Sequence, residues 1–259
     1  MCGPISPVAS GRWWPGARSR NVSTVSAPSD AAVARHPHLG QLLAPGLVRV
    51  DCHSHTMWSG DATTTPDELL AAVTATGIDV LCITDHSATN GAVAMRDVLP
   101  CRVVVGEELR TTAGELIGLF LIERIPQGIR PDEFCHRVHE QGGVVYVPHP
   151  FDPMRQALRD DVMQQLAEAG LIDAVEVLNA KVSLPHLTKR AEDFAQLHDL
   201  PGGAGSDAHV PDAIGAAYME MPDFSTPAEF LVSLRAGRAM GHHFDAARKW
   251  TARIVPSIT

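Results

Sequence analysis

The chain has 259 residues, of which 45% are hydrophobic, and a formal net charge of −9 at pH 7. This length suits one large α/β domain with a substantial core, and no apolar run approaches the roughly 18 residues of a membrane helix. The acidic balance argues against a general nucleic-acid-binding surface, which needs a basic stripe. A phosphate substrate stays possible, because bound divalent cations reverse the local field.

Residues 1–45 differ in composition from the rest of the chain. They are rich in Ser, Ala, Pro, Gly and Arg, and the first acidic residue is Asp30. Such a segment buries little apolar surface, so we expect a disordered N-terminal tail and one folded domain over residues 46–259. A mis-assigned start and an organellar transit peptide are the alternatives, although three prolines interrupt any amphipathic pattern.

The five cysteines are spread along the chain without a CxxC pair. Cys52 and Cys82 lie inside apolar runs, which is typical of buried free thiols in a reducing compartment. We therefore expect a soluble cytoplasmic protein.

From Leu47 onward, short apolar runs alternate with helical patterns, which predicts βα units and a mostly parallel sheet or barrel. The expected strands are Val48–His53, Val80–Thr84, Arg102–Glu108, Leu116–Ile122, Gly143–Val147, Ala174–Leu178 and a short one near Gly203. The first helix has a strong start signal in Thr65-Pro66-Asp67-Glu68 and ends at Gly77. Further helices are expected at Pro131–Gln141, Leu158–Gly170, Leu184–Leu200 and Thr226–Gly237.

Imidazole and carboxylate groups follow the ends of these strands. His53 and His55 share one face of the first strand, because side chains two residues apart on a strand point the same way. The other fragments are Thr84-Asp85-His86, Gly106-Glu107-Glu108, Pro148-His149-Pro150 and Ser206-Asp207-Ala208-His209. The carboxyl ends of barrel strands meet at one rim, so this pattern predicts a polynuclear metal centre there.

Taken together, these motifs resemble the ordered motifs of the polymerase-and-histidinol-phosphatase (PHP) family. The matching segments are His53-Ser54-His55-Thr56, Ser59-Gly60-Asp61, Ile83-Thr84-Asp85-His86, Gly106-Glu107-Glu108, Pro148-His149-Pro150 and Gly205-Ser206-Asp207-Ala208-His209. The resemblance covers about residues 48–240. It implies a distorted seven-stranded β/α barrel, similar to a TIM barrel, that holds two or three divalent ions and hydrolyses phosphoesters.

The resemblance also implies a ligand set. His53, His55, Glu108 and Asp207 would hold the first metal, Glu108 would bridge to a second metal bound by His149, and Asp61, His86 and His209 would form the third site. Mixed imidazole and carboxylate ligands suit Mn, Fe or Zn.

One departure from the family pattern concerns the second site. Where many members have a His after the Gly-x-Glu motif, this chain has Glu115. A carboxylate there favours Mn or Fe over Zn, and the alternative is a weak or empty site. Of the neighbouring pair, the family spacing selects Glu108, and strand alternation turns Glu107 away.

These ligands lead to a functional prediction. We expect a phosphoesterase that hydrolyses a small phosphorylated metabolite, or a nucleotide or oligonucleotide end, through a metal-bridging hydroxide. Arg155 is the candidate phosphate clamp, and Asn179 and Lys181 are candidates for contacts with substrate or ligands. A non-catalytic metal-holding barrel and a hydrolase of non-phosphoester substrates are the alternatives. We expect no long nucleic acid or membrane partner, and oligomeric state stays open.

Overall fold

The computed structural model describes residues 26–246. Within this range the strands are β1 (Leu47–Ser54), β2 (Val80–Ile83), β3 (Arg102–Thr111), β4 (Gly114–Leu119), β5 (Val144–Val147), β6 (Ala174–Asn179), β7 (Gly202–Gly205), β8 (Ala217–Pro222) and β9 (Arg238–Gly241). The helices are α1 (Asp30–Arg35), α2 (Pro66–Thr76), α3 (Asn90–Met95), α4 (Pro131–Glu140), α5 (Asp160–Glu168), α6 (Pro185–Leu197) and α7 (Pro227–Ala236). Short 3₁₀ turns are η2 (Pro37–Gly40), η3 (Met57–Ser59) and η4 (Pro211–Ala213).

The strands form one curved sheet in the order β7-β6-β5-β4-β3-β2-β1-β8-β9. The sheet nearly closes on itself, because the loop after β7 returns to the end of β1. There Ser54 forms a parallel bridge with Ala208, and the Asp207 N–H donates to the His53 carbonyl at 2.8 Å. The predicted α/β-barrel class is confirmed, with nine strands in residues 26–246 instead of seven.

The expectation of a mostly parallel sheet is wrong, because four strand pairs in the described range are parallel and four are antiparallel. β3 and β4 form a hairpin that starts from the pair Thr111 and Gly114. A connection this short can only join antiparallel strands. β8 and β9 add two further antiparallel pairings that the apolar pattern did not predict.

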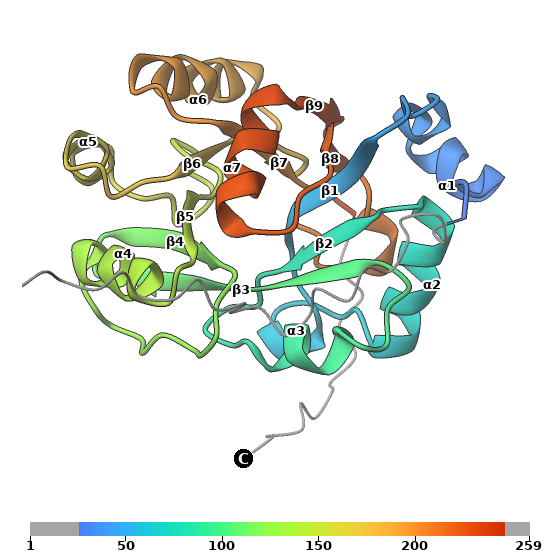
Figure 1. Cartoon of the computed structure of the whole chain (residues 1–259), viewed down its shortest axis with the longest axis horizontal. Coiled ribbons are helices and arrows are strands. Elements are labelled where there is room, and N and C mark those ends of the chain that lie inside the picture. The colour runs from blue at the N-terminus through green and yellow to red at the C-terminus, as the bar shows by residue number, and fades with distance from the viewer. Residues whose placement is uncertain (1–25, 247–259) are drawn as a thin grey trace, which may run out of the picture.

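Two hydrophobic layers hold the barrel together. The inner layer fills its interior with residues such as Val50, Val104 and Tyr146, and it includes Phe230 and Leu234 from α7. The outer layer lies between the sheet and the surrounding helices (Figure 1). Because apolar side chains fill this part of the interior, the histidines and carboxylates of the predicted centre gather toward one end of the barrel.

A bulge in β1 aims its two histidines. Asp51 pairs with Leu81 and Ser54 with Ile83, so β1 has one more residue than β2 in this stretch. Strict alternation would turn His53 away from the face that carries Val50 and Cys52. The extra residue reverses the alternation and directs His53 into the barrel.

The glycine content of β7 has a steric cause. A Cβ atom at Gly205 would lie 2.4 Å from the Cβ of His53 and 2.7 Å from Oε1 of Glu176. Only glycine lets this strand approach the β1 histidine so closely. This requirement explains why the strand near Gly203 has a weak sequence signal.

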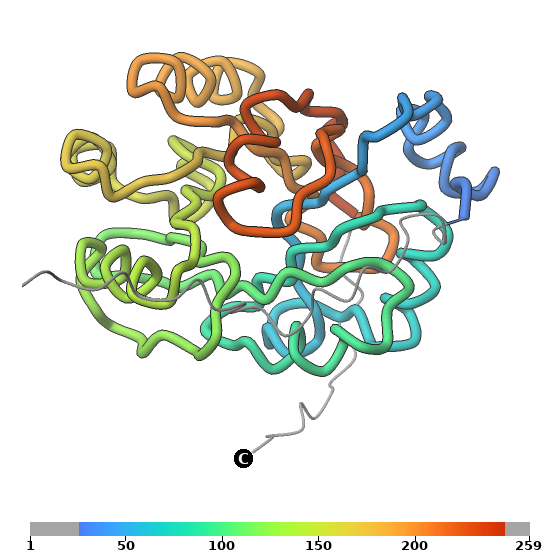
Figure 2. Tube along the Cα trace, viewed as in Figure 1, coloured from blue at the N-terminus to red at the C-terminus, as the bar shows by residue number. Residues whose placement is uncertain are grey.

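The predicted tail is described only from residue 26, and this part contains α1 and η2. The Ser29 hydroxyl accepts from the Ala32 N–H and caps α1, and the Ser29 N–H donates to Ala75 of α2. In Figure 2 this segment lies at the edge of the barrel beside α2. Residues 1–25, with the transit-like bias, fall outside the described residues.

The described residues include four of the five cysteines and all of the assigned helices. Cys52, Cys82, Cys101 and Cys135 are buried free thiols. Among residues 26–246, none of the helices combines the length and apolarity needed to span a bilayer.

Candidate metal centre

The first group of predicted ligands meets at the end of β1. The Nε2 atoms of His53 and His55 lie 3.0 Å apart. Glu108 Oε2 lies 3.3 and 3.2 Å from these two nitrogens, and Asp207 Oδ1 lies 3.8 and 3.4 Å from them. All four side chains are at most 4% exposed. Two imidazoles and two carboxylates from β1, β3 and the loop after β7 thus surround one point.

A second group shares Glu108 with the first. His149 Nε2, from the loop after β5, lies 3.0 Å from Glu108 Oε1 and 3.7 Å from Glu115 Oε2. The two oxygens of Glu108 therefore face different groups, which is the arrangement of a bridging carboxylate. Glu115, the second residue of β4, thus lies beside Glu108 and His149 in this group.

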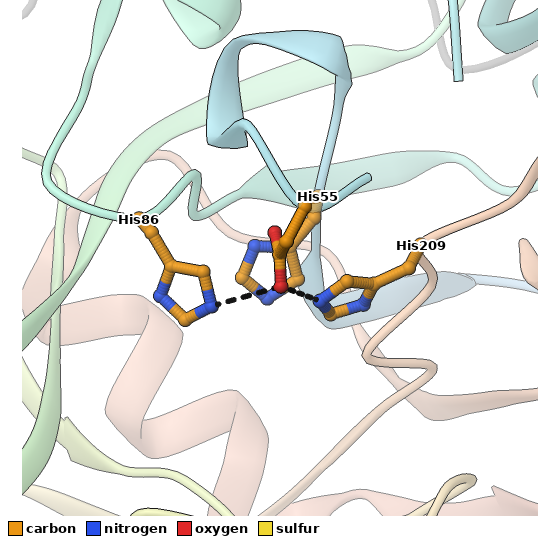
Figure 3. A group of neighbouring side chains, drawn as sticks. His55, His86 and His209 are labelled. Atoms are coloured by element: carbon orange, nitrogen blue, oxygen red, sulfur yellow. Dashed lines mark hydrogen bonds and ion pairs between the residues drawn. The ribbon is translucent and has the colours of Figure 1, made fainter. Parts of the chain in front are cut away.

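A third group lies closer to solvent. Figure 3 shows the imidazoles of His55, His86 and His209 gathered together, with ion pairs drawn as dashed lines. Asp61 Oδ2 lies 2.9 Å from Nε2 of His209 and 3.6 Å from Nε2 of His86. His55 is near enough to offer a donor atom to this group, a contact that the sequence prediction had placed only in the first group.

Burial differs across the centre. The Asp61 and His86 side chains are 37% and 30% exposed, whereas the side chains of the other seven predicted ligands are at most 9% exposed. Access from solvent is therefore on the side of the third group.

Glu176 is a supporting residue that the sequence prediction missed. Its Oε1 lies 3.2 Å from Nδ1 of His53, and its Oε2 accepts from the His149 N–H at 2.6 Å and from Nδ2 of Asn179 at 2.9 Å. An Nδ1–H that donates to a carboxylate leaves the lone pair on Nε2, which is the nitrogen that faces the first group. The sequence does carry a signal for this role, because Glu176 is a carboxylate within the otherwise apolar run of β6.

Other polar side chains fix the backbone around the ligands. Asp51 Oδ1 accepts from the N–H groups of His53 and Ser206, and the Asp85 carboxylate accepts from the Thr56 N–H and hydroxyl. The Ser59 hydroxyl lies 3.0 Å from Nδ1 of His55 and accepts from the His86 N–H. Asp85 thus anchors the turn after His55.

Two predicted ligands sit on strained backbone. His149 has a φ of 28° and Asp207 a φ of 47°, and non-glycine residues rarely occupy this region. The hydrogen bonds from their N–H groups, to Glu176 and to the His53 carbonyl, hold these conformations. Strain that the surroundings enforce is typical of functional sites.

The donors perturb one another's protonation. Burial alone would raise the pKa of Glu108, but the charge of His53 and hydrogen bonds from His149 and His53 hold it well below its usual range. Burial opposes protonation of His55, yet hydrogen bonds to Asp207 and Glu108 raise its pKa to about 9. Burial and the charge of His55 lower the pKa of His209 to about 4. Coupled groups of this kind mark functional sites.

The remaining predicted residues lie around the centre. Arg155 donates through Nη2 to the Lys181 carbonyl at 3.3 Å, and its Nε lies 3.8 Å from Asp152 Oδ2. Lys181 places its ammonium 3.4 Å from Asp207 Oδ1. Glu107 points away from the centre, as predicted, but it is buried and accepts from the Ile125 N–H at 2.8 Å.

Divalent cations fit this donor set. The facing Nε2 atoms of His53 and His55 share at most one proton, and the buried carboxylates around them need positive charge. Within each of four overlapping groups, the donor atoms lie within 4.8 Å of one another. Imidazole with carboxylate is a donor mixture suited to transition metals.

The fold and this donor set together define a metal-dependent hydrolase of the α/β-barrel class. A family model described as the PHP domain matches residues 51–197, and one described as PHP-associated matches residues 185–239. The chain therefore belongs to the PHP family.

Two uncharacterized proteins of Methanocaldococcus jannaschii are similar in sequence. One is 37% identical over 146 residues, which cover 51% of this chain and 82% of the relative. The other is 33% identical over 197 residues, which cover 73% of this chain and 79% of the relative.

Solved structures share the fold at low identity. A two-domain protein of Bacteroides vulgatus, containing a predicted PHP-like metal-dependent phosphoesterase, has a TM-score of 0.61 at 18% identity, covering 78% of this chain and 67% of that chain. PsfC of Pseudomonas syringae has a TM-score of 0.59 at 20% identity, covering 76% and 92%. Endonuclease Q, bound to a duplex with an abasic lesion, has a TM-score of 0.56 at 15% identity, covering 73% and 56%.

Proposed function

We propose that this protein is a metal-dependent phosphoesterase acting on a small phosphorylated metabolite or on a nucleotide or oligonucleotide end. The observation that carries the proposal is the set of three adjoining donor groups, in which Glu108 directs its two oxygens at different imidazoles. Two findings support a phosphoester as the substrate. The chain belongs to the PHP family, and its structural neighbours include a predicted phosphoesterase and an endonuclease bound to DNA.

We assign the metal ligands as the sequence analysis expected them. They are His53, His55, Asp61, His86, Glu108, Glu115, His149, Asp207 and His209. Two or three divalent ions, with Mn or Fe favoured by the Glu115 carboxylate, complete the proposal. When bound, such ions lower the pKa of water and neutralise charge on a phosphoryl group.

Side chains around the centre orient the metal ligands and bind the substrate. Glu176 holds the His53 ring with its Nε2 toward the first group, and the same carboxylate fixes the strained backbone of His149. Substrate enters on the side of Asp61 and His86, the more exposed ligands. Arg155, which donates to the Lys181 carbonyl in the loop after β6, is the residue that we assign to binding the phosphoryl group.

The test pairs metal content with hydrolysis. Protein purified without chelator is measured by elemental analysis and assayed on an aryl phosphate monoester and a bis-aryl phosphodiester, with and without Mn. We expect two or three ions and Mn-dependent turnover of at least one ester. Asp207→Asn should lower turnover at least about 100-fold, whereas Asp193→Asn, on the exposed face of α6, should leave it unchanged.

Other results would point to the alternatives. Bound metal without turnover of either ester would refute the phosphoesterase proposal and favour a binding module or a hydrolase of another bond, such as an amide. Absence of bound metal after Mn loading would refute the metal centre itself.

A further inference from the structure

Three histidines outside the metal centre meet where the N-terminal segment with α1 and η2 packs against the residues after β9. His36 precedes η2, His38 lies within it, and His242 follows β9 directly. The ring centroids of His36 and His38 each lie 5.2 Å from that of His242. These three residues form a histidine cluster that includes none of the ligands assigned above.

Backbone carbonyls fix the tautomers of two of these rings. Nε2 of His36 lies 2.9 Å from the Asp212 carbonyl oxygen, and Nε2 of His38 lies 3.0 Å from that of Gly215. A carbonyl oxygen only accepts, so Nε2 carries the proton in both rings and Nδ1 carries the lone pair. A ring whose second nitrogen donates to a backbone carbonyl is the usual arrangement of a histidine that binds a metal.

The Nδ1 atoms of the cluster are placed as metal donors. His36 is 0% exposed, and its Nδ1 has no hydrogen-bond partner within residues 26–246. A buried polar atom without a partner destabilises the fold, so this lone pair calls for a donor or a cation. Nδ1 of His38 lies 3.4 Å from Nδ1 of His242. Two nitrogens that bind one tetrahedral zinc ion at about 2.1 Å also lie about 3.4 Å from each other.

The surroundings keep the three rings in the form that binds a metal. The Phe244 ring lies 4.9 Å from that of His36, and the Tyr218 ring lies 5.2 Å from that of His38. Burial lowers the pKa of His36 to about 4, and it lowers the pKa of His38 and of His242 as well. The rings are therefore neutral at pH 7, as metal ligands must be.

The donor set favours a different metal from the one expected at the centre. The Asp212 carboxylate pairs with Arg35 at 3.1 Å, and the Glu220 carboxylate pairs with Arg238 at 2.8 Å. The cluster therefore offers imidazole nitrogens without a carboxylate. Imidazole suits zinc, copper and nickel, whereas manganese prefers oxygen ligands.

We propose that the histidine cluster is a zinc site, separate from the metal centre, in which Nδ1 of His36, His38 and His242 bind one ion and a water molecule completes the tetrahedron. The ring centroids of His36 and His38 lie 6.1 Å apart, against roughly 5 Å for two imidazoles on one tetrahedral ion, so His36 moves toward the ion on binding. The ion links the N-terminal segment to the residues after β9.

The experiment measures zinc binding by the full chain. Elemental analysis after zinc loading should find one ion fewer in His38→Gln and in His242→Gln than in the wild type, because each variant lacks a donor. His36→Gln should weaken zinc binding at this site at least about 10-fold. His136→Gln, which replaces an exposed histidine of α4, is the matched control and should bind as much zinc as the wild type.

Two further measurements locate the ion and its effect. Anomalous diffraction at the zinc edge from zinc-loaded wild-type crystals should show a peak between Nδ1 of His38 and Nδ1 of His242. Zinc should also slow amide hydrogen exchange in α1 and η2 of the wild type but not of His242→Gln, although the substitution lies outside these two elements.

Each contrary result overturns a specific claim. A zinc-loaded wild-type crystal without a peak at the histidine cluster overturns the inference, and so does equal zinc content in the wild type and in folded His38 and His242 variants. If these variants do not fold, the wild-type crystal decides. Zinc bound at the cluster with unchanged hydrogen exchange in α1 and η2 overturns the proposed link between the two segments.

Discussion

Replacing Glu176 by Gln is expected to weaken metal binding without touching a metal ligand. Oε2 of Glu176 receives two N–H donors, from His149 and Asn179, so a glutamine must keep its carbonyl oxygen there. Its NH₂ group then replaces Oε1, 3.2 Å from Nδ1 of His53. Nδ1 also lies 3.4 Å from Oε2, the oxygen that the glutamine keeps, but the closer NH₂ donor favours an accepting Nδ1 and a ring proton on Nε2. A protonated Nε2 cannot bind a metal.

The size of the effect follows from the hydrogen bond that is lost. Hydrogen bonds to charged groups contribute about 1.5–3 kcal/mol, and removing the partner of a histidine ligand typically costs 10- to 100-fold in metal affinity. We expect a loss of this size for the most tightly bound Mn ion, measured by competition with a chelating dye. Glu192→Gln, an exposed substitution on α6, is the matched control and should bind Mn like the wild type. Equal affinity in the Glu176 variant and the control would refute the assigned orientation of His53.

Three further predictions concern the second metal, pH and stability. Glu115→Ala should remove one bound ion and lower turnover at least about 10-fold, and Glu115→His should restore both the ion and the turnover. An unchanged metal content in the alanine variant would show that Glu115, 3.7 Å from His149, is no ligand. The pKa of His55 is raised to about 9, so Mn must displace a proton from this residue, and the affinity for Mn should fall as pH falls below 9. Calorimetry in two buffers measures the protons released on Mn binding, and a release of zero would contradict this prediction. Burial lowers the pKa of His36 to about 4 from 6.5, so the unfolded chain takes up the proton first and the free energy of unfolding should fall as pH falls from 6.5 to 4, by at most about 3 kcal/mol. His36→Gln should reduce this loss in urea titrations, and an identical pH dependence in both proteins would disprove the assignment.

The sequence predicted which imidazole and carboxylate groups lie together, because most of these residues lie near strand ends. β1, β5 and β7 each carry a histidine or carboxylate of the centre within two residues of their last residue, and parallel strands bring such ends to one rim. Glu108 instead lies three residues before the end of β3, because this strand continues to Thr111 in the hairpin with β4. The family spacing selected Glu108, and strand alternation turned Glu107 away; in the structure Glu108 lies among the imidazoles, and the Glu107 carboxylate accepts from the Ile125 N–H.

What the sequence did not predict depends on tertiary contacts. The bulge that aims His53 arises from pairing with β2, and the role of Glu176 depends on the neighbouring loops. In the same way, His38 and His242 are 204 positions apart in the sequence, yet their Nδ1 atoms lie 3.4 Å from each other. Strands β8 and β9 were missed because short runs such as Ala217–Pro222 carry little periodic signal.

The most direct test of the metal centre is anomalous diffraction at the manganese edge from crystals of the Mn-loaded protein. We predict a peak among His53, His55, Glu108 and Asp207, a second beside His149 and Glu115, and a third among Asp61, His86 and His209. Peaks at these positions would establish the ligand set on which every other claim depends. A loaded crystal with no peak near Glu108, or with manganese bound only elsewhere on the molecule, would contradict the account.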